Sequence, residues 1–186
     1  MTKADIKTDN KIWYLISLIC FDILRFFLGI FHKELTKSGF EAFMQFVKFG
    51  IVGLSNTIIA YIIYAGVLFL FESNDWLPKY DYLIASVLSF VLSVLWSFFW
   101  NSRKVFVVEE GEKRDWFPAL VKTFVAYSFT GLFLSNVLLV IWVKVFHISK
   151  YIAPLINLIV TIPLNFIINK FWAFKTKKTS GKKNQE

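Results

Sequence analysis

Four long stretches of this chain contain no charged side chain: 49–71, 82–101, 123–143 and 151–169. A helix needs about 20 predominantly apolar residues to cross a hydrocarbon core about 30 Å thick. Helices suit that environment because every backbone polar group is paired within the segment. We therefore predict an all-α membrane protein with four transmembrane helices. The content of 56% hydrophobic and 18% charged residues also argues against a soluble globular enzyme.

The positions of the basic residues predict the orientation. All but three of the 21 Lys and Arg residues lie before the first predicted span, between the second and third, or after the fourth. The exceptions are Lys79, Lys144 and Lys150. Cytoplasmic loops carry the excess of Lys and Arg in membrane proteins. We predict a multi-pass protein of the cytoplasmic (plasma) membrane with both termini in the cytoplasm, which accounts for the net charge of +8 without a nucleic-acid partner.

Residues 1–45 are predicted to form a separate cytoplasmic or interfacial segment. Within it, 12–31 are mostly apolar, but Asp22 and Arg25 lie near the middle. Polar or small residues recur along one stripe of a helix, mostly at intervals of three, four or seven: Lys11, Tyr14, Asp22, Arg25, Gly29 and His32. We predict an amphipathic helix in the cytoplasmic interface. A fifth span is the alternative, although a mid-membrane charge costs at least about 2.5 kcal/mol.

The rest of the chain is predicted to consist of a four-helix transmembrane domain, 46–174, and a disordered basic cytoplasmic tail, 175–186. The tail is polar and rich in Lys, a composition that cannot bury enough apolar surface to fold.

The second and fourth spans align when one is shifted by 68 residues. Polar side chains then coincide at four-residue intervals: Ser89, Ser93, Ser97 and Asn101 match Asn157, Thr161, Asn165 and Asn169. Four-residue spacing places each set on one face of its helix. Lys48 precedes the first span as Lys122 precedes the third. The sequence thus predicts two parallel helical-hairpin repeats, related by an axis near the membrane normal.

This polar stripe has two interpretations. Ser and Thr can pack membrane helices together, at about 0.6 kcal/mol per contact. Alternatively, the stripe is a polar lane that opens to the cytoplasm, where Asn101 and Asn169 lie beside Arg103, Lys104 and Lys170. Amide donors and cations together suit an anion, and Arg suits a pair of phosphate oxygens. The positive-inside pattern alone accounts for each single cation, whereas the equivalent positions of the two asparagines favour a site.

The sequence lacks the residues that several kinds of chemistry require. None of the four spans contains Asp, Glu, Lys, Arg or His, one of which normally carries the proton in a proton-coupled exporter. The sequence has no catalytic triad, metal-ligand cluster or glycine-rich phosphate loop. The mixed charges of 109–115 are typical of a solvated turn. We therefore expect neither an enzyme nor a cofactor or metal.

Two motifs resemble those of a known family. Residues 48–57, KFGIVGLSNT, are similar to the basic-Phe-x-x-Val-Gly-x-x-Asn-Thr opening of the GtrA-like family of small four-span bacterial membrane proteins. Residues 165–174, NFIINKFWAF, resemble that family's Asn-Phe-x-x-Asn-basic-x-Trp-x-Phe ending. The second span closes less typically, with Ser97 at the first Asn position and Lys104 at the Trp position.

The resemblance implies a role in polysaccharide biosynthesis. It implies that the protein flips a polyprenyl-phosphate-linked monosaccharide to the outer leaflet, where the sugar decorates teichoic acid or another cell-surface polymer. The candidate residues for binding the lipid phosphate and sugar are Asn101, Arg103, Lys104, Asn169, Lys170, Asn165, Ser97, Lys48, Asn56 and Lys122.

Two alternatives remain from the residues alone. The protein could be a non-transporting subunit that anchors or activates a membrane glycosyltransferase, with the amphipathic helix as its docking element. It could also be a small-molecule exporter. Because four short helices can hardly enclose a sugar-sized pore, we expect a homo-oligomer.

Overall fold

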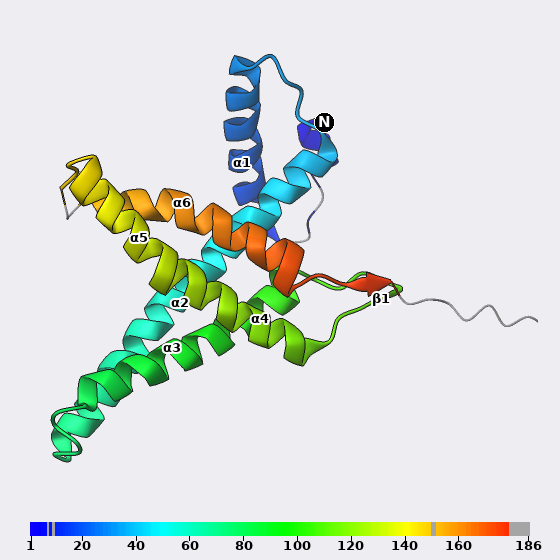
Figure 1. The fold of residues 1–186 in the computed structure, drawn as a ribbon. Helices are drawn as coiled ribbons and strands as arrows, with labels where there is room; N and C mark the ends of the chain where they lie inside the picture. The colour runs from blue at the N-terminus through cyan, green and yellow to red at the C-terminus, as the bar shows by residue number, and fades with distance from the viewer. Residues whose placement is uncertain (7, 9, 150–151, 179–186) are drawn as a thin grey trace, which may run out of the picture. The chain divides into compact units, whose positions relative to one another are not determined.

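The computed structural model describes residues 1–6, 8, 10–149 and 152–178. The described chain is helical almost throughout (Figure 1). It divides into two compact units, Met1–Lys48 and Phe49–Glu186, and helix α2 (Lys37–Ser73) continues from the first into the second.

Helix α1 (Lys11–Ile30) and the beginning of α2 pack together in the first unit, which also contains a short 3-10 helix, η1 (Lys3–Asp5). Asn10 caps α1, because its side-chain oxygen accepts hydrogen bonds from two backbone N–H groups of the first turn. The rings of Phe21 and Phe40 meet edge to face, with 5.9 Å between centroids. The buried face of α1 therefore rests on α2.

The opposite face of α1 is apolar and exposed. Its exposed residues are Ile12, Leu15, Ile19, Ile23, Phe26, Phe27 and Ile30. Asp22, one of the two charges near its middle, is paired at 2.8 Å with Lys3. By length and composition α1 is one of five helices among the described residues that could cross a membrane, one more than the four predicted spans. Its placement in the interface stays a prediction.

The second unit holds the other long helices. After α2 come α3 (Asp81–Trp100) with a π-helical turn, η2 (Asn101–Val105), and α6 (Ala153–Ile168) with a matching turn, η5 (Asn169–Ala173). Between them one continuous helix comprises α4 (Trp116–Ser128), η3 (Phe129–Leu134), α5 (Ser135–Val140) and η4 (Ile141–Val145).

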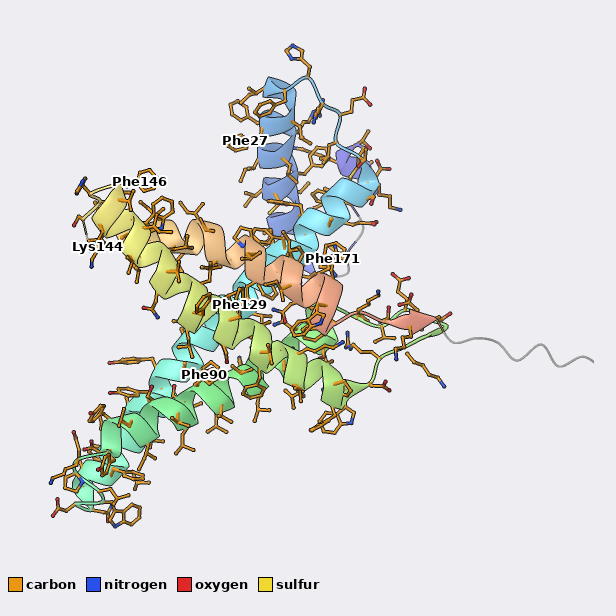
Figure 2. The ribbon with its side chains drawn as sticks, viewed as in Figure 1. Phe27, Phe90, Phe129, Lys144, Phe146 and Phe171 are labelled. Carbon is orange, nitrogen blue, oxygen red and sulfur yellow. The ribbon has the colours of Figure 1, made fainter. Side chains whose placement is uncertain are left out.

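Apolar side chains project from the surfaces of these helices (Figure 2). Phe129, Phe146 and Phe171 are all exposed. Apolar surface on this scale is unfavourable in water and favourable in lipid. The chain is a predominantly helical, multi-pass membrane protein.

Two short strands connect the α3–α4 loop with the C-terminal region. Strand β1 (Glu112–Lys113) pairs antiparallel with β2 (Lys177–Lys178), with Glu112 opposite Lys178. Thr176 Oγ1 also donates a short hydrogen bond to the Glu112 carboxylate. Lys177 and Lys178 thus belong to a strand, and the predicted disorder of the tail stays a prediction. Its remainder, 179–186, lies outside the described residues.

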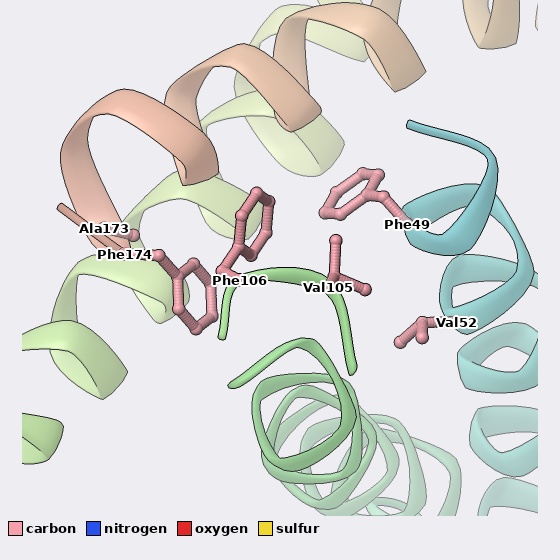
Figure 3. Packing of buried hydrophobic residues seen from close by; sticks show 6 residues of the cluster. All are labelled: Phe49, Val52, Val105, Phe106, Ala173 and Phe174. Atoms are coloured by element: carbon pink, nitrogen blue, oxygen red, sulfur yellow. The ribbon is translucent and has the colours of Figure 1, made fainter. Parts of the chain in front are cut away.

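The core of the second unit contains the phenylalanine cluster, which comprises Phe49, Val52, Val105, Phe106, Ala173 and Phe174 (Figure 3). Phe106 stacks on Phe174 with ring centroids 4.7 Å apart. Phe98 stacks on Phe174 at 5.5 Å, and its counterpart 68 residues later, Phe166, stacks on Phe106 at 5.9 Å. Such interchanged contacts are what a two-fold relation between two similar segments produces.

Buried positions recur at the same spacing. The pairs that are buried in both helices are Ala85 and Ala153, Ser89 and Asn157, Asn101 and Asn169, Val105 and Ala173, and Phe106 and Phe174. On α2 and α4, Phe49 and Val52 are buried, as are Thr123 and Ala126, 74 residues later. The sequence periodicity therefore has a counterpart in the packing.

Candidate functional site

Asn101 and Asn169 occupy matching backbone environments. Each lies where a regular helix passes into a π-helical turn, and each has a fully buried side chain, with 0% exposure. The carbonyl oxygen of Asn101 accepts from the N–H of Phe106 at 2.7 Å, and that of Asn169 accepts from Phe174 at 2.8 Å.

The side-chain nitrogen of each asparagine donates to a partner within the protein. Asn169 Nδ2 donates to the backbone oxygen of Asn165 at 2.8 Å and to Asn165 Oδ1 at 2.9 Å. Asn101 Nδ2 donates to Ser97 Oγ at 3.1 Å, and Ser97 Oγ shares a hydrogen bond of 2.7 Å with Tyr127 Oη of α4. Because a backbone carbonyl can only accept, the orientation of the Asn169 amide is determined.

The amide oxygens are left without partners. Within the described residues, the side-chain oxygens of Asn56, Asn101 and Asn169 are buried and accept no hydrogen bond. The sequence predicted that these amides donate to a phosphate, but both N–H groups of Asn169 are already engaged. What the geometry offers a ligand is acceptors, and phosphate oxygens cannot donate to them.

Cations surround this end of the second unit. The Arg103 guanidinium lies 4.2 Å from the centroid of the Phe99 ring, and Lys170 Nζ lies 5.5 Å from that of Phe166. Lys122 Nζ lies over the Trp172 ring and donates to the Trp172 carbonyl at 3.5 Å, while Lys104 is exposed. Cation–π contacts at exposed sites are worth only about 0.5–1 kcal/mol. We call Arg103, Lys104, Lys122 and Lys170 the cationic rim.

Lys48 is a predicted site residue whose cation–π contact is with the first unit. It belongs to the first unit, where its Nζ lies 5.6 Å from the centroid of the Trp13 ring.

Arg114 is a residue that the sequence reasoning missed. Its guanidinium donates to the Phe106 carbonyl at 2.6 Å and to the Ser102 carbonyl at 3.4 Å, and it lies 5.0 Å from the Phe174 ring centroid. Burial lowers the pKa of this guanidinium. Arg114 joins the α3–α4 loop to the end of α3, although its charged neighbours in sequence indicated only a solvated turn. Tyr127 was missed too, because nothing in the sequence pairs it with Ser97.

The part of the stripe further from the cluster is different in character. Asn157 Oδ1 accepts from Trp142 Nε1 at 2.8 Å, while Asn157 Nδ2 donates to the backbone and side-chain oxygens of Ser135 at 2.8 and 3.0 Å. Ser89 Oγ donates to the Ala60 carbonyl at 2.6 Å. Each residue joins neighbouring helices through fully used polar groups, which is a packing role.

Comparison with known proteins agrees with the motifs. The sequence model of the GtrA/DPMS transmembrane domain family matches residues 48–174. The chain belongs to this family. It is also similar to the cell wall teichoic acid glycosylation protein GtcA of Listeria monocytogenes serovar 1/2a (strain ATCC BAA-679 / EGD-e), at 27% identity over 130 residues, which cover 66% of this chain and 88% of that protein. No solved structure matches.

The range that the GtrA/DPMS model matches contains the candidate site residues. Every candidate residue, from Lys48 at its first position to Lys170 near its last, lies within the matched range. The exposed apolar helix α1 lies outside it, so this helix is an addition to the shared domain.

Proposed function

We propose that this protein carries a polyprenyl-phosphate-linked monosaccharide across the bacterial cytoplasmic membrane for glycosylation of a cell-wall polymer such as teichoic acid. Family membership and the likeness to GtcA support a role in cell-wall glycosylation. The observation that carries the transport proposal is the pair Asn101 and Asn169, which are buried, incompletely paired and next to a cationic rim.

Two parallel hairpins form the transport unit in this proposal. The interchanged stacking of Phe98 with Phe174 and of Phe166 with Phe106 supports a two-fold relation between them. The distribution of Lys and Arg supports an orientation with both termini in the cytoplasm. The phenylalanine cluster then closes the cytoplasmic end, and α1 lies in the cytoplasmic interface with its apolar face in the lipid.

The cationic rim binds the lipid phosphate. Arg103 can present two parallel N–H donors to two phosphate oxygens, whereas Lys104, Lys122 and Lys170 supply point charges. Their contacts with aromatic rings are weak, so the side chains can turn towards an anion. The protein itself makes and breaks no covalent bond in this proposal. A separate glycosyltransferase attaches the sugar, and a homo-oligomer supplies the width that four helices lack.

Deletion of the protein from its host tests this proposal. The surface polymer should lose one sugar substituent and keep its backbone, and the polyprenyl-phosphate sugar should still be made and should accumulate. Mass spectrometry of the lipid extract and of the purified polymer measures both. If the lipid precursor disappears as well, the protein supports synthesis, and the role of a subunit that activates a glycosyltransferase replaces that of a flippase.

A further inference from the structure

The three unpaired amide oxygens lie on one side of the phenylalanine cluster. Asn56 follows Val52 by four residues, whereas Asn101 and Asn169 precede Val105 and Ala173 by four. Residues four apart share a helix face and lie about one turn from each other. Because α2 leads away from the cluster while α3 and α6 lead towards it, all three asparagines are displaced in the same direction, into the spans.

The chemistry of the unpaired atoms restricts the ligand. An unpaired acceptor in a buried site is unfavourable, and three of them together point to a donor that binds there. The phosphate group of the proposed lipid-linked sugar is a diester and has no hydrogen to donate to these oxygens. A cation would be repelled by the rim, and the described spans near it offer no carboxylate to offset the charge.

Two further buried atoms without partners favour a ligand with hydroxyl groups. They are Trp100 Nε1, which can only donate, and Ser102 Oγ. A hydroxyl group can donate to an amide oxygen and accept from an indole N–H, whereas a metal cation can satisfy only the first and a phosphate only the second. Trp100 packs against the phenylalanine cluster.

We infer that Asn56, Asn101 and Asn169 are the sugar subsite, and that their amide oxygens accept hydrogen bonds from the hydroxyl groups of the carried monosaccharide. The inference rests on the proposed function and assigns the two parts of the proposed ligand to different residues. The cationic rim holds the phosphate, and the amide oxygens, one turn deeper than the phenylalanine cluster, recognise the sugar. The hydrogen bond from Asn169 Nδ2 to the Asn165 carbonyl holds this amide in the receptive orientation, and Asn101 Nδ2 donates to Ser97 Oγ.

Binding of paired probes to the full-length protein tests the subsite. The protein is purified in a detergent without a sugar headgroup, and its affinity is measured for citronellyl phosphate and for a panel of citronellyl phosphohexoses. At least one phosphohexose should bind more tightly than citronellyl phosphate. The variant Asn169→Ala should lose about two- to tenfold of that preference, the range for one neutral hydrogen bond, with unchanged affinity for citronellyl phosphate.

A matched control and a second variant keep the result interpretable. Asn157→Ala, on the same helix, should lower the melting temperature and leave the sugar preference intact. If Asn169→Ala does not fold, Asn56→Ala, at a half-buried position, should reduce the preference in the same way.

Four outcomes would each contradict a different part of the proposal. Equal affinity of the wild-type protein for all probes refutes the sugar subsite and leaves phosphate binding in place. A loss of citronellyl phosphate affinity in Asn169→Ala assigns the asparagine to the phosphate instead. Stabilisation by sodium chloride over choline chloride that disappears in Asn169→Ala assigns it to a cation. Failure of every probe to bind refutes the proposed function itself.

Discussion

Asn157 and Asn169 lie twelve residues apart on one continuous helix, and both are buried, with 2% and 0% exposure. Asn157 uses its oxygen and its nitrogen to hold Trp142 and Ser135. Among the described residues, the Asn169 side chain bonds only within its own helix, and its oxygen has no partner. Burial and residue type are therefore the same at the two positions, and hydrogen-bond saturation separates a packing residue from a candidate binding residue.

The second span shows the same contrast. Ser89 reaches the Ala60 carbonyl of the neighbouring helix, whereas Asn101, on the same stripe, has a buried oxygen without a partner. The incompletely paired positions in both spans are next to the phenylalanine cluster. A single stripe thus combines a structural part with a part that is available to a ligand.

The largest effect is expected from a labelling test of which end of the polar stripe faces the cytoplasm. In a Cys20→Ser background, single cysteines replace Asn74, Glu110 or Ser149. An impermeant thiol reagent added to intact cells should label positions 74 and 149 and leave 110 unlabelled, because the positive-inside pattern places 110 in the cytoplasm. The neighbouring Gly111 is avoided as a labelling position, because its φ of +80° would strain any other residue. Labelling at 110 alone would move the incompletely paired asparagines to the outer face.

The next largest effect should follow replacement of Asn157, whose side-chain polar atoms all have hydrogen-bond partners. Asn157→Ala leaves the Trp142 N–H without its acceptor and removes both hydrogen bonds to Ser135, which should lower the free energy of unfolding by about 1–3 kcal/mol. Thermal unfolding in detergent measures the loss. The fraction that stays folded should transport as the wild type does; impaired transport at unchanged stability would show that saturation does not distinguish the two parts of the stripe.

A smaller effect is expected at the cationic rim. Arg103→Lys keeps the charge and removes the paired donors, so the affinity for citronellyl phosphate should fall about three- to tenfold. Lys113→Arg, at an exposed position of β1, is the matched control and should bind normally. Equal affinities for wild type and Arg103→Lys would remove Arg103 from the phosphate site.

The smallest effect should come from Arg114→Gln. This change removes the charged donors to the Phe106 and Ser102 carbonyls while it leaves the asparagines and the rim in place. We expect a loss of about 1 kcal/mol in unfolding free energy with the sugar preference unchanged. A changed preference in isothermal titration would mean that the loop contact shapes the site itself.

The helices and the polar stripe could be predicted because they depend on local pattern. Charge-free length indicates a span, and four-residue spacing places Ser97, Asn101, Asn165 and Asn169 on common faces. The family resemblance, carried by Lys48 to Thr57 and Asn165 to Phe174, is confirmed. These features need no knowledge of which helices are neighbours.

The state of each polar atom could not be predicted, because it depends on partners from other elements. Tyr127 of α4 forms a hydrogen bond with Ser97 of α3, and Arg114 reaches back from a loop to the end of α3. The pairing of Lys177 with Lys113 likewise joins segments that are distant in sequence. Spacing alone also suggested that the asparagine amides donate to phosphate, whereas the bonds of Asn169 to Asn165 leave its acceptor side free.

The most direct test of the central claim measures transport and melting temperature on the same preparations of two variants. One is the double variant Asn101→Ala, Asn169→Ala, and the other is Asn157→Ala. In liposomes that contain a polyprenyl-phosphate sugar, the double variant should lose about tenfold or more in transport while it keeps most of its melting temperature, and Asn157→Ala should show the reverse. Normal transport by a folded double variant would contradict the claim that the incompletely paired asparagines bind the cargo.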